Sequence, residues 1–123
     1  MSEEGSNEMI TRLKAGPRMS QVVIHGNTVY LAGQVASNRS ADTTGQTREI
    51  LATIDGLLAE AGTDKTHVLA ATVYLADMST FNEMNAVWEA WIAPGCAPTR
   101  ATVGAPLASS AYRVEIVVTA ARP

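Results

Sequence analysis

Two β-rich runs near the end of the chain constrain the fold most. Residues 99–103 (TRATV) and 113–119 (RVEIVVT) are rich in β-branched residues that alternate with other types, which is typical of strands. Side chains on a strand point alternately to two faces, so residues two apart share a face. One face of the second run is therefore entirely apolar and carries Val114, Ile116, Val118 and Ala120.

The other faces of these two runs carry charged side chains. We place Ala101 and Val103 against the same core as the apolar face of the second run. Arg100 and Glu115 then project together from the second face of two adjacent strands. This pair would suit carboxylate binding and proton handling, or it is an ordinary cross-strand ion pair. Spacing alone favours the ion pair.

Further strands are predicted in the first half of the chain. Residues 9–13 predict a short first strand. The dipeptide Gly26-Asn27 separates β-rich runs at residues 21–25 and 28–32, which predicts a hairpin because both turn residues tolerate positive φ. Gly33 follows the second of these strands and allows a ligand or a neighbouring backbone to approach closely, although a plain strand-ending glycine fits equally well.

Two helices are predicted, with a strand between them. Apolar residues recur at helical spacing over residues 46–61 and again over residues 80–92, where Thr80 and Glu83 have the spacing of a capping box. The second helix contains Trp88, whose aromatic stripe is typical of core packing rather than of a ligand cage. Residues 68–75 are apolar on both faces, which indicates an interior strand.

The resulting order, β-β-β-α-β-α-β-β, predicts an α+β fold in which two helices cover one face of a single sheet. We expect residues 1–8, which are polar and acidic, to form a mobile leader, and residues 9–123 to form one domain. The uncovered face of the sheet is too apolar to stay in contact with water. Self-association into a homo-oligomer is therefore expected.

Composition excludes several classes of function. The net charge is −3, so the positive surface of a nucleic-acid-binding protein is absent. A single cysteine fits a reducing compartment. No charged-then-apolar secretory leader opens the chain, and no apolar run is long enough to span a bilayer. A soluble cytoplasmic protein without membrane attachment is therefore expected. His25, His67 and Cys96 lack the spacing of metal ligands, so no metal site is predicted.

Several motifs together resemble the Rid family (RidA/YjgF, reactive intermediate/imine deaminases, also called the endoribonuclease L-PSP family). The most specific is the pattern of Pro98, Arg100 and Glu115, in which the arginine follows the proline by two residues. The resemblance runs over nearly the whole chain after the leader. Its carrying segments are residues 26–34, 46–62, 81–88, 97–100 and 113–116.

The resemblance implies a chorismate-mutase-like α+β fold with a mixed sheet. It also implies a homotrimer with an inner β-barrel and with active clefts between subunits. The implied activity is hydrolysis of 2-imino acids, or their enamine tautomers, to 2-oxo acids and ammonia, without a metal or organic cofactor. Arg100 matches the family residue that holds the substrate carboxylate, and Glu115 matches the one that positions the attacking water. Gly33 matches a residue whose backbone contacts the ligand, and Trp88 is placed with the substrate-binding residues.

Two departures from the family pattern bear on substrate choice. The family archetype has a pocket tyrosine in its first loop, where this chain has Arg18 and Met19. The archetype's cysteine two residues after the arginine is Thr102 here. Neither change removes the implied clamp or the water-positioning residue. Both are expected to alter the preferred substrate size, and they place the chain in a divergent subgroup.

Three other functions compete with the deaminase. A trimer that binds a small carboxylate metabolite without catalysis would need Arg100 but not Glu115. A ribonuclease or translation-inhibitor activity, ascribed to some relatives, is disfavoured by the acidic charge balance and by the lack of a basic strip with interleaved aromatic residues. A chaperone-like role under oxidative stress is neither supported nor opposed by the sequence.

Overall fold

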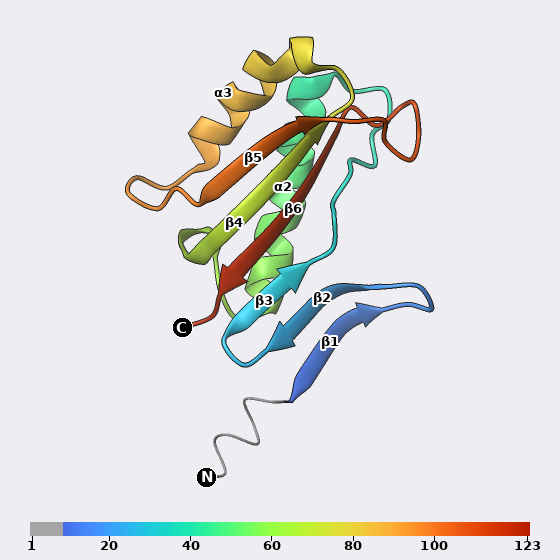
Figure 1. Cartoon of the computed structure of the whole chain (residues 1–123). Helices are drawn as coiled ribbons and strands as arrows, with labels where there is room; N and C mark the ends of the chain where they lie inside the picture. Colours follow the sequence, from blue (N-terminus) through green and yellow to red (C-terminus); the bar gives the residue numbers. More distant parts are fainter. Residues whose placement is uncertain (1–8) are drawn as a thin grey trace.

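The computed structural model describes residues 9–123, so the expected leader at residues 1–8 lies outside the described residues. The described residues form a six-stranded sheet with the order β1-β2-β3-β6-β4-β5 (Figure 1). β4 and β5 run parallel, whereas the other neighbouring strands are antiparallel, so the sheet is mixed. The strands are β1 (Ile10–Ala15), β2 (Ser20–His25), β3 (Thr28–Leu31), β4 (Val68–Leu75), β5 (Thr99–Gly104) and β6 (Val114–Ala121).

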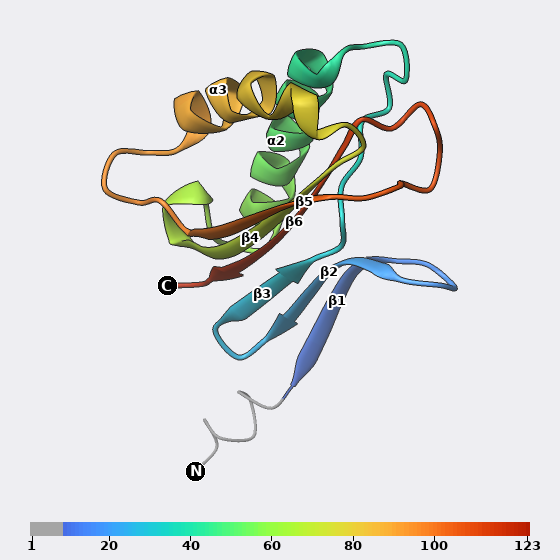
Figure 2. The same cartoon turned by 45° about the horizontal axis from the view of Figure 1, so that its top comes forward.

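Two α-helices, α2 (Thr43–Glu60) and α3 (Phe81–Trp91), lie on the same face of this sheet (Figures 1 and 2). The helices also bind each other, since the Trp91 Nε1 donates a hydrogen bond of 3.0 Å to the Asp55 carboxylate. The expected α+β architecture, with one face of a mixed sheet covered, is confirmed. Its core includes the apolar stripe of α2 and the predicted apolar face of β6: Ile50, Leu51, Ile54, Leu57, Leu58, Val114, Ile116, Val118 and Ala120.

The predicted hairpin joins β2 to β3. Gly26 adopts a φ of 61°, in the left-handed region that an L side chain rarely enters. The pairing of His25 with Thr28 leaves a two-residue loop, as the Gly26-Asn27 sequence predicts. β4 also spans residues 68–75, as predicted, and lies between two other strands.

The helix starts differ from the predicted ones. α2 begins at Thr43 because the Asp42 side chain caps it, accepting a hydrogen bond of 2.8 Å from the Gly45 amide. The predicted capping box at the start of α3 is wrong. Thr80 Oγ1 donates to the Asp77 carbonyl at 2.7 Å instead, because a short 3-10 turn (Met78–Thr80) precedes the helix and Asp77 caps that turn.

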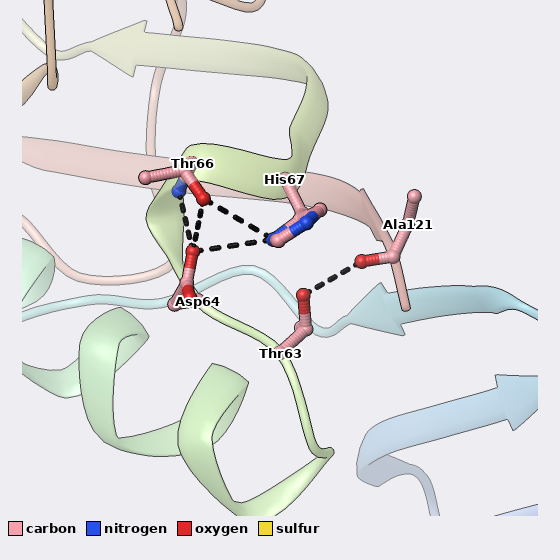
Figure 3. Close-up of polar contacts among 5 residues, drawn as sticks. All are labelled: Thr63, Asp64, Thr66, His67 and Ala121. Atoms are coloured by element: carbon pink, nitrogen blue, oxygen red, sulfur yellow. Dashed lines mark hydrogen bonds and ion pairs between the residues drawn. The ribbon is translucent and has the colours of Figure 1, made fainter. Parts of the chain in front are cut away.

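The connection from α2 to β4 is closed by local hydrogen bonds (Figure 3). Asp64 Oδ1 accepts from the Thr66 amide at 2.9 Å and from the Thr66 hydroxyl, and it lies 3.2 Å from His67 Nδ1. The Thr66 hydrogen bonds are the main cause that lowers the pKa of the Asp64 carboxyl. Thr63 Oγ1 donates to the Ala121 carbonyl at 2.7 Å, which ties this turn to the end of β6. His67 therefore belongs to a structural turn.

The predicted arrangement of the last two strands is wrong in two respects. β5 and β6 are not neighbours, because β4 lies between them. The parallel register pairs Arg100 with Ala71 and Thr102 with Val73, so both side chains lie on the helix-covered face of the sheet. Glu115 lies on the opposite face, since its neighbours Val114 and Ile116 point into the core.

The uncovered face of the sheet carries several apolar side chains. Val103, predicted to be in the core, is 42% exposed there, and Tyr30 on β3 is 47% exposed. β5 is an edge strand whose outer face no helix covers, so its apolar residues remain outside. The apolar character expected for this face therefore holds, although Val103 lies on it instead of in the core.

Candidate functional site

Arg100 lies against a stripe of three α3 residues. Phe81, Asn85 and Trp88 follow the i, i+4, i+7 spacing of one helix face, and this face is turned toward β5. The guanidinium carbon lies 5.6 Å from the centre of the Phe81 ring and 5.4 Å from that of Trp88. Arg100 Nη1 donates a hydrogen bond of 2.7 Å to Asn85 Oδ1. The guanidinium is thus fixed by aromatic rings and an amide, with no carboxylate partner among the described residues.

A hollow of about 400 Å³ opens in front of this guanidinium, and we call it the arginine hollow. Trp88 is 5% exposed, so the expected core role is confirmed, and the same ring also forms part of the wall. Most of the remaining wall is apolar, which would strengthen a charge-assisted hydrogen bond to the arginine. The lining residues are Asn85, Trp88, Glu89, Ile92, Ala97, Pro98 and Arg100.

Glu115 occupies a second hollow, which we call the glutamate hollow, of about 320 Å³ on the other face of the sheet. Its walls come from Tyr74 on β4, Val117 on β6 and the loop of residues 105–108. The Glu115 carboxylate lies against the backbone of Gly33, where a Cβ would overlap Oε2 and lie 3.1 Å from Cδ. The structure therefore brings Gly33 and Glu115 together, and glycine at this position leaves room for the carboxylate.

Within one chain, the two hollows do not join. Arg100 is level with Ala71 and Glu115 with Tyr74, on strands separated by β4 and on opposite faces of the sheet. The cross-strand ion pair that spacing favoured is therefore absent, and so is a joint site within one chain. Each residue instead lines a hollow of its own.

Thr102 and Arg18 occupy different surroundings. Thr102 lies two residues after Arg100 on the same face, and its Oγ1 is buried without a hydrogen-bond partner among the described residues. A buried hydroxyl without a partner is uncommon. Arg18 lies in the exposed turn between β1 and β2, and it forms no ion pair with another described residue. This turn leads into β2, where the Gln21 carbonyl accepts a hydrogen bond from the Ala32 amide, next to Gly33. The turn therefore lies at the Gly33 end of the sheet.

Two residues that the sequence reasoning did not single out hold the loops around Glu115. Gln46 is fully buried, donates to the carbonyls of Ala41 and Ala111, and accepts from the Arg113 amide at 2.9 Å. It therefore fixes the loop that leads into β6. Glu49 accepts from the backbone amides of residues 37 and 38, in the loop that follows Gly33. Both lie on the first turns of α2. This helix was predicted from the spacing of its apolar residues alone, so its polar residues were not considered.

Acidification should release the loop that Glu49 holds. The amide hydrogen bonds, first that of Ser37 and then that of Asn38, lower the pKa of Glu49 below its usual 4.5. Because the folded-state pKa is depressed, this carboxylate stabilises the fold above pH 4.5, and the contribution is lost as the pH falls through the lowered value. The amide proton shifts of Ser37 and Asn38 should titrate together below pH 4.5 and should not titrate in Glu49→Gln. A shared midpoint at or above pH 4.5 would contradict this.

No group of three or more histidine, cysteine, aspartate or glutamate side chains in residues 9–123 is arranged to hold a metal ion. Over the same residues, none of the helices combines the length and the apolar character needed to cross a bilayer.

Comparison with known proteins identifies the family of this chain. The family model described as Endoribonuclease L-PSP matches residues 9–122. The chain belongs to this family. A RutC family protein of Haemophilus ducreyi is 48% identical over 113 residues, which cover 92% of this chain and 97% of that protein. The RutC family protein YoaB of Escherichia coli is 46% identical over 112 residues, covering 91% and 97% of the two chains.

Solved structures of L-PSP family relatives agree with the fold. NMB1025 of Neisseria meningitidis, a member of the YjgF protein family, has a TM-score of 0.93 and 44% identity, covering 95% of this chain and 98% of that one. YyfA of Yersinia pestis, a Rid family protein, has a TM-score of 0.81 and 26% identity over 87% of this chain and 90% of that one. The resemblance to the Rid family, also called YjgF or L-PSP, is confirmed.

Proposed function

We propose that this protein hydrolyses reactive 2-imino acids, or their enamine tautomers, to 2-oxo acids and ammonia. Membership of the Rid family supports a general role of this kind. The observation that carries the proposal is the state of Arg100. Its guanidinium lies over two aromatic rings of α3 and lines an open, largely apolar hollow, without a direct ion-pair partner among the described residues. A planar guanidinium so placed suits a bidentate carboxylate.

We further propose that the working site is a cleft between two subunits of a homotrimer. Arg100 and Glu115 lie on opposite faces of one sheet, so a single subunit cannot present both to a small substrate. The uncovered face carries Glu115 together with exposed apolar residues, including Val103 and Tyr30. Packing this face against the β5 edge of another copy, where its arginine hollow lies, would bury that surface and bring the Glu115 of one copy toward the Arg100 of the next.

In this cleft each residue has a distinct role. Arg100 holds the substrate carboxylate and Trp88 contacts the adjacent carbons. Thr102 lies on the same face as Arg100, but its buried hydroxyl is not part of the lining of the arginine hollow. Gly33 contributes its backbone next to Glu115, and Arg18, in the turn at the Gly33 end of the sheet, is the residue we expect to influence substrate size. The imine carbon is already electrophilic. Holding the substrate and the water in the correct orientation therefore removes a large part of the barrier to hydrolysis.

The reaction balances without a further reactant. Glu115 accepts a hydrogen bond from the attacking water, whose oxygen bonds to the imine carbon. The carbon–nitrogen bond then breaks, and both water protons end on the nitrogen. A protonated imine thereby gives a 2-oxo acid and an ammonium ion. No redox step or bound cofactor is involved in this sequence.

The direct assay measures 2-oxo acid release from freshly generated 2-imino acids, one derived from alanine and one from leucine. The wild-type protein should accelerate release above the spontaneous rate for at least one of them. The ratio of the two rates reports the size of side chain that the apolar wall of the arginine hollow accepts. A wild-type rate equal to the spontaneous rate for both would overturn the deaminase.

A binding protein without catalysis is the second candidate. The arginine hollow is complete within one chain and needs no contribution from Glu115, which favours this alternative. In this case Glu115→Ala would retain both ligand binding and biological effect. Under the deaminase proposal, the same variant should bind ligand and fail to turn it over. The RNA cleavage named in the family description is less favoured, because the chain carries a net charge of −3.

A further inference from the structure

Glu89 is the second charged side chain that lines the arginine hollow. It lies one helical turn beyond Asn85 on α3, and Asn85 Nδ2 donates a hydrogen bond of 3.1 Å to its Oε2. The same amide accepts from Arg100 Nη1 at 2.7 Å. The hollow therefore contains a cation and an anion that are joined through one neutral amide.

This network fixes which end of the Asn85 amide faces each charge. Arginine has only donors and a carboxylate only acceptors, so the amide oxygen must face Arg100 and the amide nitrogen must face Glu89. The amide also keeps the two charges apart, since Arg100 and Glu89 form no direct ion pair in the structure. Both charges can therefore bind a ligand.

We infer that Glu89 makes the hollow selective for ligands that carry a positive nitrogen next to their carboxylate. With the carboxylate on Arg100, a protonated nitrogen on the adjacent carbon lies toward Glu89 and is attracted by it. A hydrogen bond at each end requires about 2.7–3.2 Å, which suits a compact zwitterion between two charges separated by one amide. The inference rests on the proposed function, and it names the substrate form as the protonated imine.

The consequence is discrimination between substrate and product. Hydrolysis replaces the charged nitrogen with a neutral carbonyl oxygen, which Glu89 does not attract. A carboxylate near the substrate carboxylate also disfavours any ligand that is purely anionic. Glu89 thus favours binding of the 2-imino acid and release of the 2-oxo acid. This makes it a specificity-determining residue.

The test compares L-alanine, a stable stand-in for the protonated 2-imino acid, with pyruvate, the matching 2-oxo acid. Dissociation constants for both are measured on the full chain by NMR titration or calorimetry at low salt. Glu89→Gln keeps an oxygen that accepts from Asn85, so the amide should stay oriented while the charge is lost. We expect the ratio of pyruvate to alanine dissociation constants to fall about fivefold in this variant, and less at high salt.

Glu83→Gln is the matched control, because Glu83 is also exposed on α3 but lines a different groove with Thr44 and Arg48. This variant should leave the ratio unchanged. An unchanged ratio in Glu89→Gln, or equal weakening of both ligands, would overturn the inference and leave the proposed function standing. If Arg100→Ala bound pyruvate as tightly as the wild type does, the carboxylate clamp itself would be wrong.

Discussion

Arg100→Ala is expected to lower the rate of 2-imino acid hydrolysis by at least about 100-fold. In most assays the rate would then equal the spontaneous rate. The substitution removes the group that holds the substrate carboxylate, so binding and orientation are lost together. The fold should survive, because Arg100 is half-buried at an edge strand and its loss mainly removes stacking on Phe81 and Trp88. That stacking contributes about 1–2 kcal/mol to the free energy of unfolding.

Two variants make this result interpretable. Arg100→Lys keeps the charge but not the planar fork, so it should retain a small part of the activity. Arg48→Ala removes an exposed arginine on α2 that lines a different groove, and it should leave hydrolysis unchanged. Full turnover by Arg100→Ala would show that the arginine does not hold the substrate.

Gly33→Ala should have the second-largest effect on the proposed reaction, a loss of about 100-fold in kcat. A methyl group at this position would overlap Glu115 Oε2, so the carboxylate has to move away from the Gly33 backbone. The φ of Gly33 is not positive, so alanine introduces no backbone strain there. Because the displaced atom is the end of a flexible side chain, the free energy of unfolding should change by less than about 1 kcal/mol.

Gly56→Ala is the matched control for this prediction. A Cβ on Gly56 meets no atom within 4 Å, and the residue lies within α2. Alanine is favoured over glycine inside a helix by about 1 kcal/mol, so this variant should be slightly more stable and fully active. Wild-type kcat in Gly33→Ala would show that the position of the Glu115 carboxylate does not matter for turnover.

The sequence predicted those parts of the fold that depend on local periodicity. The apolar face of β6, the stripe of α2 and the hairpin at Gly26-Asn27 were all confirmed, because each depends on neighbours within a few residues. The position of β4 between β5 and β6 was missed. Strand pairing is set by contacts distant in sequence, and two strands joined by one loop look like neighbours.

The pattern of β5 alone does not show on which faces of the sheet Arg100 and Glu115 lie. Ala101 and Val103 look like a core face, but the register with β4 turns Arg100 and Thr102 toward the helices. The aromatic rings of α3 allow an arginine on that side, which a simple apolar and polar alternation does not anticipate. Strand parity therefore assigned the wrong face.

The remaining residues of the candidate site were not singled out as functional from the sequence pattern. Asn85 and Glu89 are polar residues four apart on an amphipathic helix, a pattern typical of a solvated face. Their connection to Arg100 arises only when α3 packs over β5. Gln46 likewise resembles an ordinary polar residue at a helix start, although it is fully buried.

The most direct test of the proposed cleft between subunits is complementation between Arg100→Ala and Glu115→Ala. The two variants are co-expressed in equal amounts, and 2-oxo acid release from a 2-imino acid is compared with that of the wild type and of each variant alone. If each cleft combines Arg100 of one subunit with Glu115 of another, about a quarter of the clefts in the mixture contain both residues. The mixture should therefore regain about a quarter of the wild-type activity, while each variant alone stays inactive. A mixture as inactive as its components, beside an active wild type, would contradict the shared cleft.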